Sequence, residues 1–236
     1  MKTSKVKLRD KEYILEFFSG RELKNISSEK QLEIVKCYME VFNESWQENW
    51  TIEAAQNEIE SSFRISEKRI PILSLLWHEK ELAGFAWGCL TDADNLLAEK
   101  DMPFYLTTEK KEECLRITKY WLKTIVKQYK VLIFHEFGAK KKFRNSVSSF
   151  NGLSILSYAL EHGCKSLVYW TSEKSNMFRL GLSLGWYPIH FCIDNDIILM
   201  GGNVELSIQN TEYLIKENIS ANSIMWLYRQ NATRFI

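Results

Sequence analysis

One block of the chain, residues 131–187, constrains its fold more than any other segment. Apolar runs, polar loops and glycine stops divide it into a strand (131–137), a helix (152–163), a strand (165–171) and a helix (175–184). Two strands joined by a helix form a parallel pair with a right-handed crossover. The loop that opens such a helix is a natural anion site, so the block suggests a phosphate-bearing cofactor.

The segments on either side of this block predict antiparallel strands and amphipathic helices. In order, they read as a strand (12–18), a helix (28–43), a helix that Thr51 opens, a hairpin (71–78 and 82–90), an irregular stretch (91–108), a long helix (109–129), a hairpin (186–193 and 197–200, across 194–196) and terminal helices within 205–236. This order predicts an α+β fold, in which a central mixed, mostly antiparallel sheet has one parallel strand–helix–strand unit and helices on both faces.

Composition excludes several classes of protein. The net charge is +1, which argues against a nucleic-acid or anionic-membrane partner. No apolar run is long enough to span a bilayer, and the first residues show no secretory signal. The five cysteines occur singly without metal-ligand spacing, so we expect buried thiols, no bound metal and a reducing, cytoplasmic location.

The order of elements in residues 12–201 resembles the GCN5-related N-acetyltransferase (GNAT) superfamily, with Gly84 in the place of a common hairpin glycine. The resemblance implies a GNAT-like domain (1–201) with a helical insertion near 91–130, followed by a C-terminal helical extension (202–236). The pyrophosphate loop of the family reads Gln/Arg-x-x-Gly-x-Gly/Ala, and its match here retains only the first glycine. The matched residues are Ser149, Phe150, Asn151, Gly152, Leu153 and Ser154.

The same resemblance implies further contacts with the cofactor. The backbone of Phe137, Gly138 and Ala139 would bind the pantetheine arm as an added strand does. Arg144 follows a lysine run and would pair with phosphates, whereas the lysines are also consistent with a solvated loop. Lys174 stands where many members have asparagine. Asn176 either reaches the cofactor or caps the next helix.

Two neighbouring residues are the candidate catalytic groups. Glu136 lies in an apolar strand on which the family often carries its base, and burial there would raise the pKa of its carboxyl group. The structural alternative is a sheet carboxylate paired with a cation. His135 is the second candidate and points to the opposite face of the strand. Gly181 occupies the position at which many members carry a tyrosine that protonates the leaving thiolate.

The resemblance therefore implies an enzyme that transfers an acyl group, most simply from acetyl-CoA, directly to the amine of a small metabolite or amino-acid-like acceptor. Two alternatives stay open, an inactive acyl-CoA sensor or protein-interaction domain and an N-acyltransferase that uses a longer acyl donor. The insertion near 91–130 would form a lid or the face of a homodimer. Four tryptophans either line an acceptor pocket or belong to the core: Trp46, Trp50, Trp87 and Trp121.

Overall fold

A computed structural model describes residues 2–46, 49–64, 66, 68–103, 105–144, 147–192 and 196–217. Its strands form one eight-stranded sheet with the order β1-β2-β3-β4-β5-β6-β8-β7. β5 (Lys130–Ala139) runs parallel to β6 (Ser166–Ser172), whereas the pairings of β1 with β2, β2 with β3, β3 with β4, β6 with β8 and β7 with β8 are antiparallel. The predicted mixed α+β fold is confirmed.

The chain divides into two compact units. Unit 1 comprises Met1–Leu90 and His135–Ile155, and unit 2 comprises Thr91–Phe134 and Leu156–Ile236. The boundary falls inside β5, so the first half of this strand belongs to unit 2 and the second half to unit 1.

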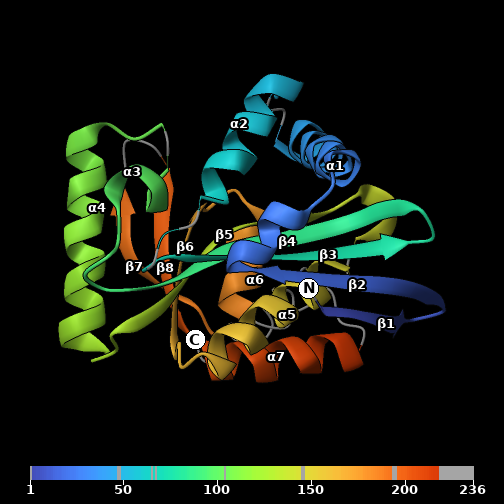
Figure 1. The fold of residues 1–236 in the computed structure, drawn as a ribbon. Helices are drawn as coiled ribbons and strands as arrows, with labels where there is room; N and C mark the ends of the chain where they lie inside the picture. Colours follow the sequence, from blue (N-terminus) through green and yellow to red (C-terminus); the bar gives the residue numbers. More distant parts are fainter. Residues whose placement is uncertain are drawn as a thin grey trace. The chain divides into compact units, whose positions relative to one another are not determined.

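Unit 1 contains an antiparallel meander of four strands (Figure 1). They are β1 (Lys2–Leu8), β2 (Lys11–Ser19), β3 (Ile70–His78) and β4 (Glu81–Asp92). The sequence pattern did not indicate β1. Its residues are almost all exposed and it lies at the edge of the sheet, where charged side chains are usual and no apolar alternation marks the strand.

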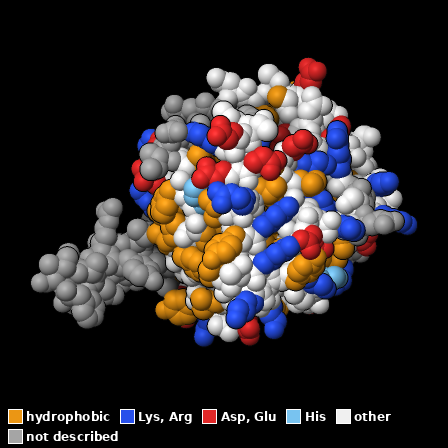
Figure 2. Space-filling view, turned by 90° about the vertical axis from the view of Figure 1, so that its left-hand side faces the viewer, with side chains coloured by type: hydrophobic (Ala, Val, Ile, Leu, Met, Phe, Trp, Pro, Cys, Tyr) orange, Lys and Arg blue, Asp and Glu red, His pale blue; other side chains and the backbone are white. Residues whose placement is uncertain are grey.

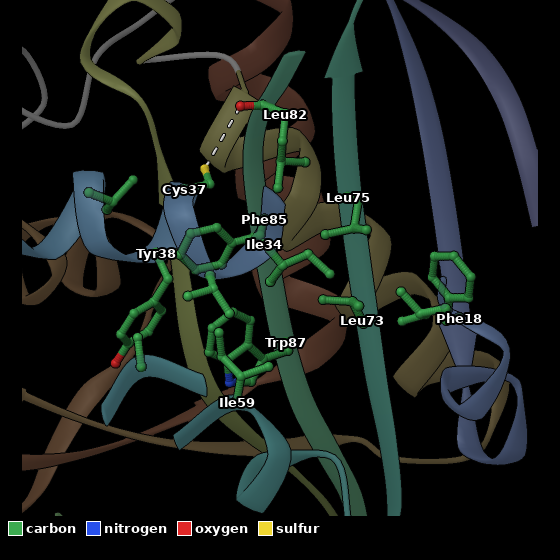
Figure 3. Packing of buried hydrophobic residues seen from close by; sticks show 14 of the residues in the cluster. Phe18, Ile34, Cys37, Tyr38, Ile59, Leu73, Leu75, Leu82, Phe85 and Trp87 are labelled. Atoms are coloured by element: carbon green, nitrogen blue, oxygen red, sulfur yellow. Dashed lines mark hydrogen bonds between the residues drawn. The ribbon is translucent and has the colours of Figure 1, made fainter. Parts of the chain in front are cut away.

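Three helices of unit 1 pack on this meander: η1 (Gly20–Asn25), α1 (Ser28–Trp46) and α2 (Ile52–Ser62). The Thr51 hydroxyl accepts a hydrogen bond from the backbone N–H of Ala54 and caps α2, as the sequence predicted. Ile34 and Tyr38 of α1 pack against Phe85 and Trp87 of β4 in a core whose members are nearly inaccessible to solvent (Figure 3). Each such side chain contributes about 1.5–3 kcal/mol through burial.

Unit 2 contains β6 and the antiparallel pair β7 (Tyr187–Cys192) and β8 (Ile197–Asn203), with α4 packed beside β7 (Figure 1). Its helices are α3 (Ala98–Asp101), α4 (Thr108–Tyr120), the π-helical turn η2 (Trp121–Ile125), α6 (Asn176–Ser183) and α7 (Val204–Lys216). The helix predicted over 109–129 therefore ends earlier, at Ile125. The predicted turn at 194–196 and the remainder of the predicted terminal helices lie largely outside the described residues.

All five cysteines are buried and form no disulfide, in agreement with the sequence. Burial raises the pKa of Cys37 to about 12, and its thiol points at the carbonyl oxygen of Leu82, 3.8 Å away (Figure 3). Burial likewise raises the pKa of Cys114 and of Cys164 to about 11. Among the described residues, no cluster of His, Cys, Asp and Glu could hold a metal ion. None of the helices described here is both long and apolar enough to cross a membrane.

Candidate cofactor site

The helix of the candidate cofactor site begins earlier than the sequence predicted. α5 runs from Val147 to Glu161, whereas the sequence placed its start at Gly152. Residues 149–154 are therefore not a loop before the helix but lie within its first two turns. Val147 is fully buried in a cluster with Ala139 and Phe143, so tertiary packing fixes the helix start despite a run of β-branched and serine residues that favour helix weakly.

Several residues of the predicted motif face the protein itself. Asn151 is fully buried, and its side-chain oxygen accepts a hydrogen bond of 2.7 Å from the Ser74 hydroxyl on β3. The Ser154 hydroxyl donates to the carbonyl of Phe150, one turn earlier in the helix. Phe150 packs against the cluster around Val147. Gly152 is also buried inside the helix, and Leu153 is half-buried. Their contact with a cofactor stays a prediction.

A different register of the motif agrees with the position of the helix. When its first residue is Arg144, the first small position falls on Val147, which is larger than the glycine of the motif, and the second falls on Ser149, near the start of α5. The first-turn N–H groups of a helix have no acceptor within it, and the first turn of α5 carries no acidic side chain. The small residues Ser148 and Ser149 follow Val147 in this first turn.

Two glycines allow close packing of the strands that lead to this helix. A Cβ atom on Gly84 of β4 would lie 2.6 Å from the carbonyl oxygen of Gly138 and 2.7 Å from a methyl group of Val147. A Cβ atom on Gly138 would lie 2.6 Å from a methyl group of Val41 on α1. These glycines therefore bring β4, β5, α1 and the first residue of α5 together.

The loop between β5 and α5 is held by ion pairs, mostly with acidic residues of α1 and β4. The Lys140 ammonium lies 3.0 Å from a carboxylate oxygen of Glu40 and 3.0 Å from one of Glu81, and Lys142 also pairs with Glu81 at 2.6 Å. Burial lowers the pKa of Lys140, but the hydrogen bonds with Glu40 and Glu81 outweigh this effect and its pKa is raised. Lys140 and Lys142 thus hold the loop through ion pairs, and Lys140 is buried rather than solvated.

Arg144 lies at the end of this loop, partly exposed and in contact with neighbouring groups. Its guanidinium side chain is 40% exposed, donates from Nε to the carbonyl of Ala139 at 3.4 Å and lies 4.0 Å from a carboxylate oxygen of Glu44. A carboxylate at this distance makes a weak, solvent-screened pair. A phosphate at the start of α5 would therefore compete with Glu44 for Arg144.

The two catalytic candidates lie in the part of β5 that belongs to unit 1. Glu136 and His135 are both half-buried, and each interacts with other parts of the molecule. As neighbours on a strand, their side chains leave opposite faces. Phe137, Gly138 and Ala139 follow directly and are buried, and the backbone N–H of Lys140 donates to the carbonyl of Ala83 on β4.

Unit 2 contains the other residues that the sequence singled out. Lys174 is exposed, and its ammonium binds a carboxylate oxygen of Asp196 at 2.5 Å, an interaction that raises its pKa. Asn176 does not cap α6, because the Ser175 hydroxyl accepts the N–H of Met177 and Asn176 is the first helical residue. The prediction that Asn176 caps this helix was therefore wrong by one residue.

The indole ring of Trp186 packs against Gly181, the residue at which the GNAT resemblance would place a tyrosine. A Cβ atom on Gly181 would lie 2.8 Å from the indole ring of Trp186. Trp186 is itself buried, and its indole N–H donates to the Ser207 hydroxyl of α7 at 2.8 Å. A larger side chain at residue 181 therefore requires this ring to move.

The tryptophans proposed for an acceptor pocket belong mainly to cores. Trp87 and Trp121 are buried in unit 1 and unit 2 respectively, and Trp121 donates from its indole nitrogen to the Tyr187 hydroxyl. Trp50 is half-buried and packs edge-on against Tyr38. The side chain of Trp46 lies outside the described residues.

No protein-family model matches the sequence, and no curated protein is similar to it. The structure is similar to an uncharacterized protein from Bacillus halodurans, with 7% identity, a TM-score of 0.53 and coverage of 92% of this chain and 97% of the other. It is also similar to the protein PH1933 from Pyrococcus horikoshii, with 14% identity, a TM-score of 0.50 and coverage of 80% and 98%. A GNAT-family acetyltransferase from Listeria monocytogenes aligns with 13% identity, a TM-score of 0.49 and coverage of 85% and 99%.

At these identities the likeness concerns the fold alone. The order of elements and the parallel β5–α5–β6 unit are those on which the sequence resemblance depended. The chain has the fold of the GNAT superfamily.

Proposed function

We propose that the protein is an acyl-CoA-dependent N-acyltransferase that acts on the amine of a small metabolite or amino-acid-like acceptor. The observation that carries the proposal is the strand–loop–helix frame of unit 1, in which Arg144 and an α5 terminus without acidic side chains follow the end of β5. The GNAT fold of the chain supports the reaction class. Acetyl-CoA is the simplest donor.

Each part of this frame has a role in the proposal. Arg144 and the first N–H groups of α5, with Ser149, would hold the phosphates, and the backbone of Phe137, Gly138 and Ala139 would hold the pantetheine arm. When bound, acyl-CoA supplies the activated thioester. The Glu136 carboxylate accepts a proton from the acceptor amine, directly or through water, and His135 is the second candidate for this task.

Arg144 tests the phosphate site. Arg144→Gln should weaken acetyl-CoA binding about 5- to 10-fold, because a charge-assisted hydrogen bond to an anion is lost. Isothermal titration calorimetry measures the affinity, and Arg21→Gln, an exposed arginine on η1, is the control. Equal affinities in the wild type and in Arg144→Gln would exclude Arg144 from the site.

Glu136 tests the chemistry. Glu136→Gln should lower kcat about 100-fold at neutral pH and leave acetyl-CoA affinity within about 2-fold, since loss of a general base typically costs 10²–10⁴ in rate. Release of CoA across a panel of small amines measures the turnover. Unchanged kcat at a saturating acceptor concentration would contradict the assignment of the base.

One observation favours a second function. Trp186 fills the space next to Gly181, where many members of the superfamily carry their acid, so an inactive acyl-CoA sensor is consistent with unit 2. Saturable binding of acetyl-CoA without release of CoA for any amine would support the sensor. Tighter binding and turnover with a longer acyl-CoA would instead identify a long-chain N-acyltransferase.

We further propose that the protein is cytoplasmic and has no nucleic-acid or membrane partner. We also propose that it forms a homodimer. Figure 2 shows hydrophobic side chains gathered on the face that contains α4 and β7. Tyr120 of α4 and Tyr187 and Phe191 of β7 are 60%, 43% and 55% exposed, and β7 is an edge strand. Light scattering coupled to size-exclusion chromatography measures the mass, and Phe191→Lys should shift a dimer toward the monomer.

A further inference from the structure

A cavity of about 560 Å³ lies within unit 1, among η1, the first half of α1 and the second half of α2. Its volume is in the range of small-molecule sites, which are typically 300–1,000 Å³. Its walls are largely apolar and include Leu23, Ile34, Ile59 and Phe63, and its rim has the cations Lys24 and Arg64. No sequence pattern indicated this cavity, because its residues come from three elements and form no motif.

The cavity is separate from the candidate cofactor site. Along α1 its lining extends from Gln31 to Val35, whereas Val41 contacts Gly138 of β5 about 9 Å farther along the helix axis. The cavity therefore lies apart from the residues that the proposed acyl transfer uses, and binding to it can be measured separately.

The charges at the rim favour an anion. Neither Lys24 nor Arg64 has a carboxylate partner in the part of the chain that the structure describes, and both are exposed. Glu60 also lines the cavity, but it accepts a hydrogen bond of 2.9 Å from Gln56 on its own helix. Lys24 and Arg64 together carry one more charge than Glu60, so the rim of the cavity has a net positive charge and its interior is apolar.

A buried polar group lies behind the same wall. Trp87 is fully buried, and its indole nitrogen has no hydrogen-bond acceptor within the described residues. Its ring contacts Phe63 edge-on at a centroid distance of 5.7 Å, and Figure 3 shows its nitrogen beside Ile59. Both neighbours line the cavity, so we expect a ligand there to change the surroundings of the Trp87 indole.

We propose that this cavity binds a small apolar carboxylate, whose hydrocarbon body lies against Ile34, Ile59 and Phe63 and whose carboxylate group lies between Lys24 and Arg64. The apolar interior provides the affinity, because transfer of hydrocarbon from water is favourable in proportion to the area buried. The two cations select an anion over a neutral or cationic analogue of the same length.

The first experiment compares three probes of one chain length on the full-length protein. Octanoate should bind about 5- to 10-fold more tightly than octanamide, and octylamine should bind more weakly than both, as measured by isothermal titration calorimetry. Octanoate should also shift the indole N–H resonance of Trp87, which the spectrum of Trp87→Phe identifies. Equal affinities for octanoate and octylamine, or no binding of octanoate, would overturn the proposal.

Exposed positions supply variants that should fold normally. The double substitution Lys24→Gln and Arg64→Gln should weaken octanoate binding about 10-fold and leave octanamide binding unchanged, since each exposed charge contributes up to about 5-fold. Arg21→Gln, on η1 but outside the cavity lining, is the matched control and should bind as the wild type does.

A blocking variant tests the location. Gln56 is exposed and lines the cavity, so Gln56→Trp should abolish octanoate binding, whereas Asn57→Trp, at the next residue of α2 and outside the lining, should not. Thermal unfolding confirms that both variants fold. Retained binding in Gln56→Trp would place the carboxylate elsewhere. Acetyl-CoA titrations of the same variants keep the two proposals distinguishable, because the cofactor affinity should not change.

Discussion

Glycines of unit 1 and unit 2 serve opposite purposes around the residues that a GNAT fold uses. In unit 1, Gly84 brings the backbone of β4 against the carbonyl of Gly138 and leaves room for Val147 at the start of α5. In unit 2, Gly181 makes room for the ring of Trp186. The neighbour of Gly84 is a backbone oxygen, whereas the neighbour of Gly181 is an aromatic side chain. The two contacts therefore differ in how far the neighbouring atoms can move away.

The largest effect should come from adding one methyl group to each of these glycines. Gly84→Ala should lower the free energy of unfolding by about 3 kcal/mol, because its nearest obstacle is a backbone oxygen at 2.6 Å that cannot rotate away. Gly181→Ala should cost about 1 kcal/mol, since the indole ring at 2.8 Å can tilt. Urea denaturation measures both values.

This pair of variants also tests the contrast itself. If Gly181→Ala destabilises the protein as much as Gly84→Ala does, the Trp186 ring is as rigidly held as a strand, and the contrast between the two units disappears. The control is Gly181→Ala introduced into Trp186→Phe and compared with Trp186→Phe alone, because the smaller ring should remove most of the cost of the added methyl group.

A smaller effect is expected from the ion pairs that hold the loop of unit 1. Lys140→Met should lower the free energy of unfolding by about 1 kcal/mol, because Glu40 and Glu81 lose their shared partner but are exposed enough to regain water. Lys142→Met is the matched control and should change it by less than about 0.5 kcal/mol, as the Lys142 side chain is 60% exposed. Equal losses of unfolding free energy in the two variants would mean that the burial of Lys140 does not strengthen its ion pairs.

The smallest effect is a pH dependence at the same loop. Hydrogen bonds from Lys142 and then Lys140 lower the pKa of Glu81 below its ordinary value of 4.5. A lowered folded pKa stabilises the protein above the ordinary value, and this contribution disappears as the pH falls through the folded pKa. The difference in stability between wild type and Glu81→Gln should be below about 1 kcal/mol at pH 7 and should shrink as the pH falls below 4.5 and through the folded pKa. A difference that does not shrink as the solution is acidified would contradict the ion-pair explanation.

Most of the fold could be predicted from the sequence, because apolar periodicity and caps are local signals. Thr51 marked α2, and the apolar runs on either side of Glu79 marked β3 and β4. The start of α5 could not be predicted, since Val147 is fixed by contacts with Ala139 and Phe143 rather than by its neighbours in sequence. β1 was missed for the opposite reason, as an exposed edge strand has little apolar pattern.

The residues of the candidate site stay predictions, and the structure adds contacts among them that the sequence does not reveal. Arg144 could be identified because it follows the strand and precedes the helix. The interaction of Lys140 with Glu40 and Glu81 could not be foreseen, since these residues are distant in sequence and pair only through the fold. In the same way, nothing around Gly181 indicated that the ring of Trp186 would cover it.

The burial of the cysteines has a practical consequence for enzymology. Acyl transfer from acyl-CoA liberates a thiol, and Ellman's reagent detects thiols by colour. With Cys37, Cys114 and Cys164 buried and their pKa values raised to about 12, 11 and 11, the native chain presents little thiolate of its own to this reagent. The background colour in such an assay should be low while the protein is folded. The rate at which this colour increases after addition of urea would measure the rate of unfolding.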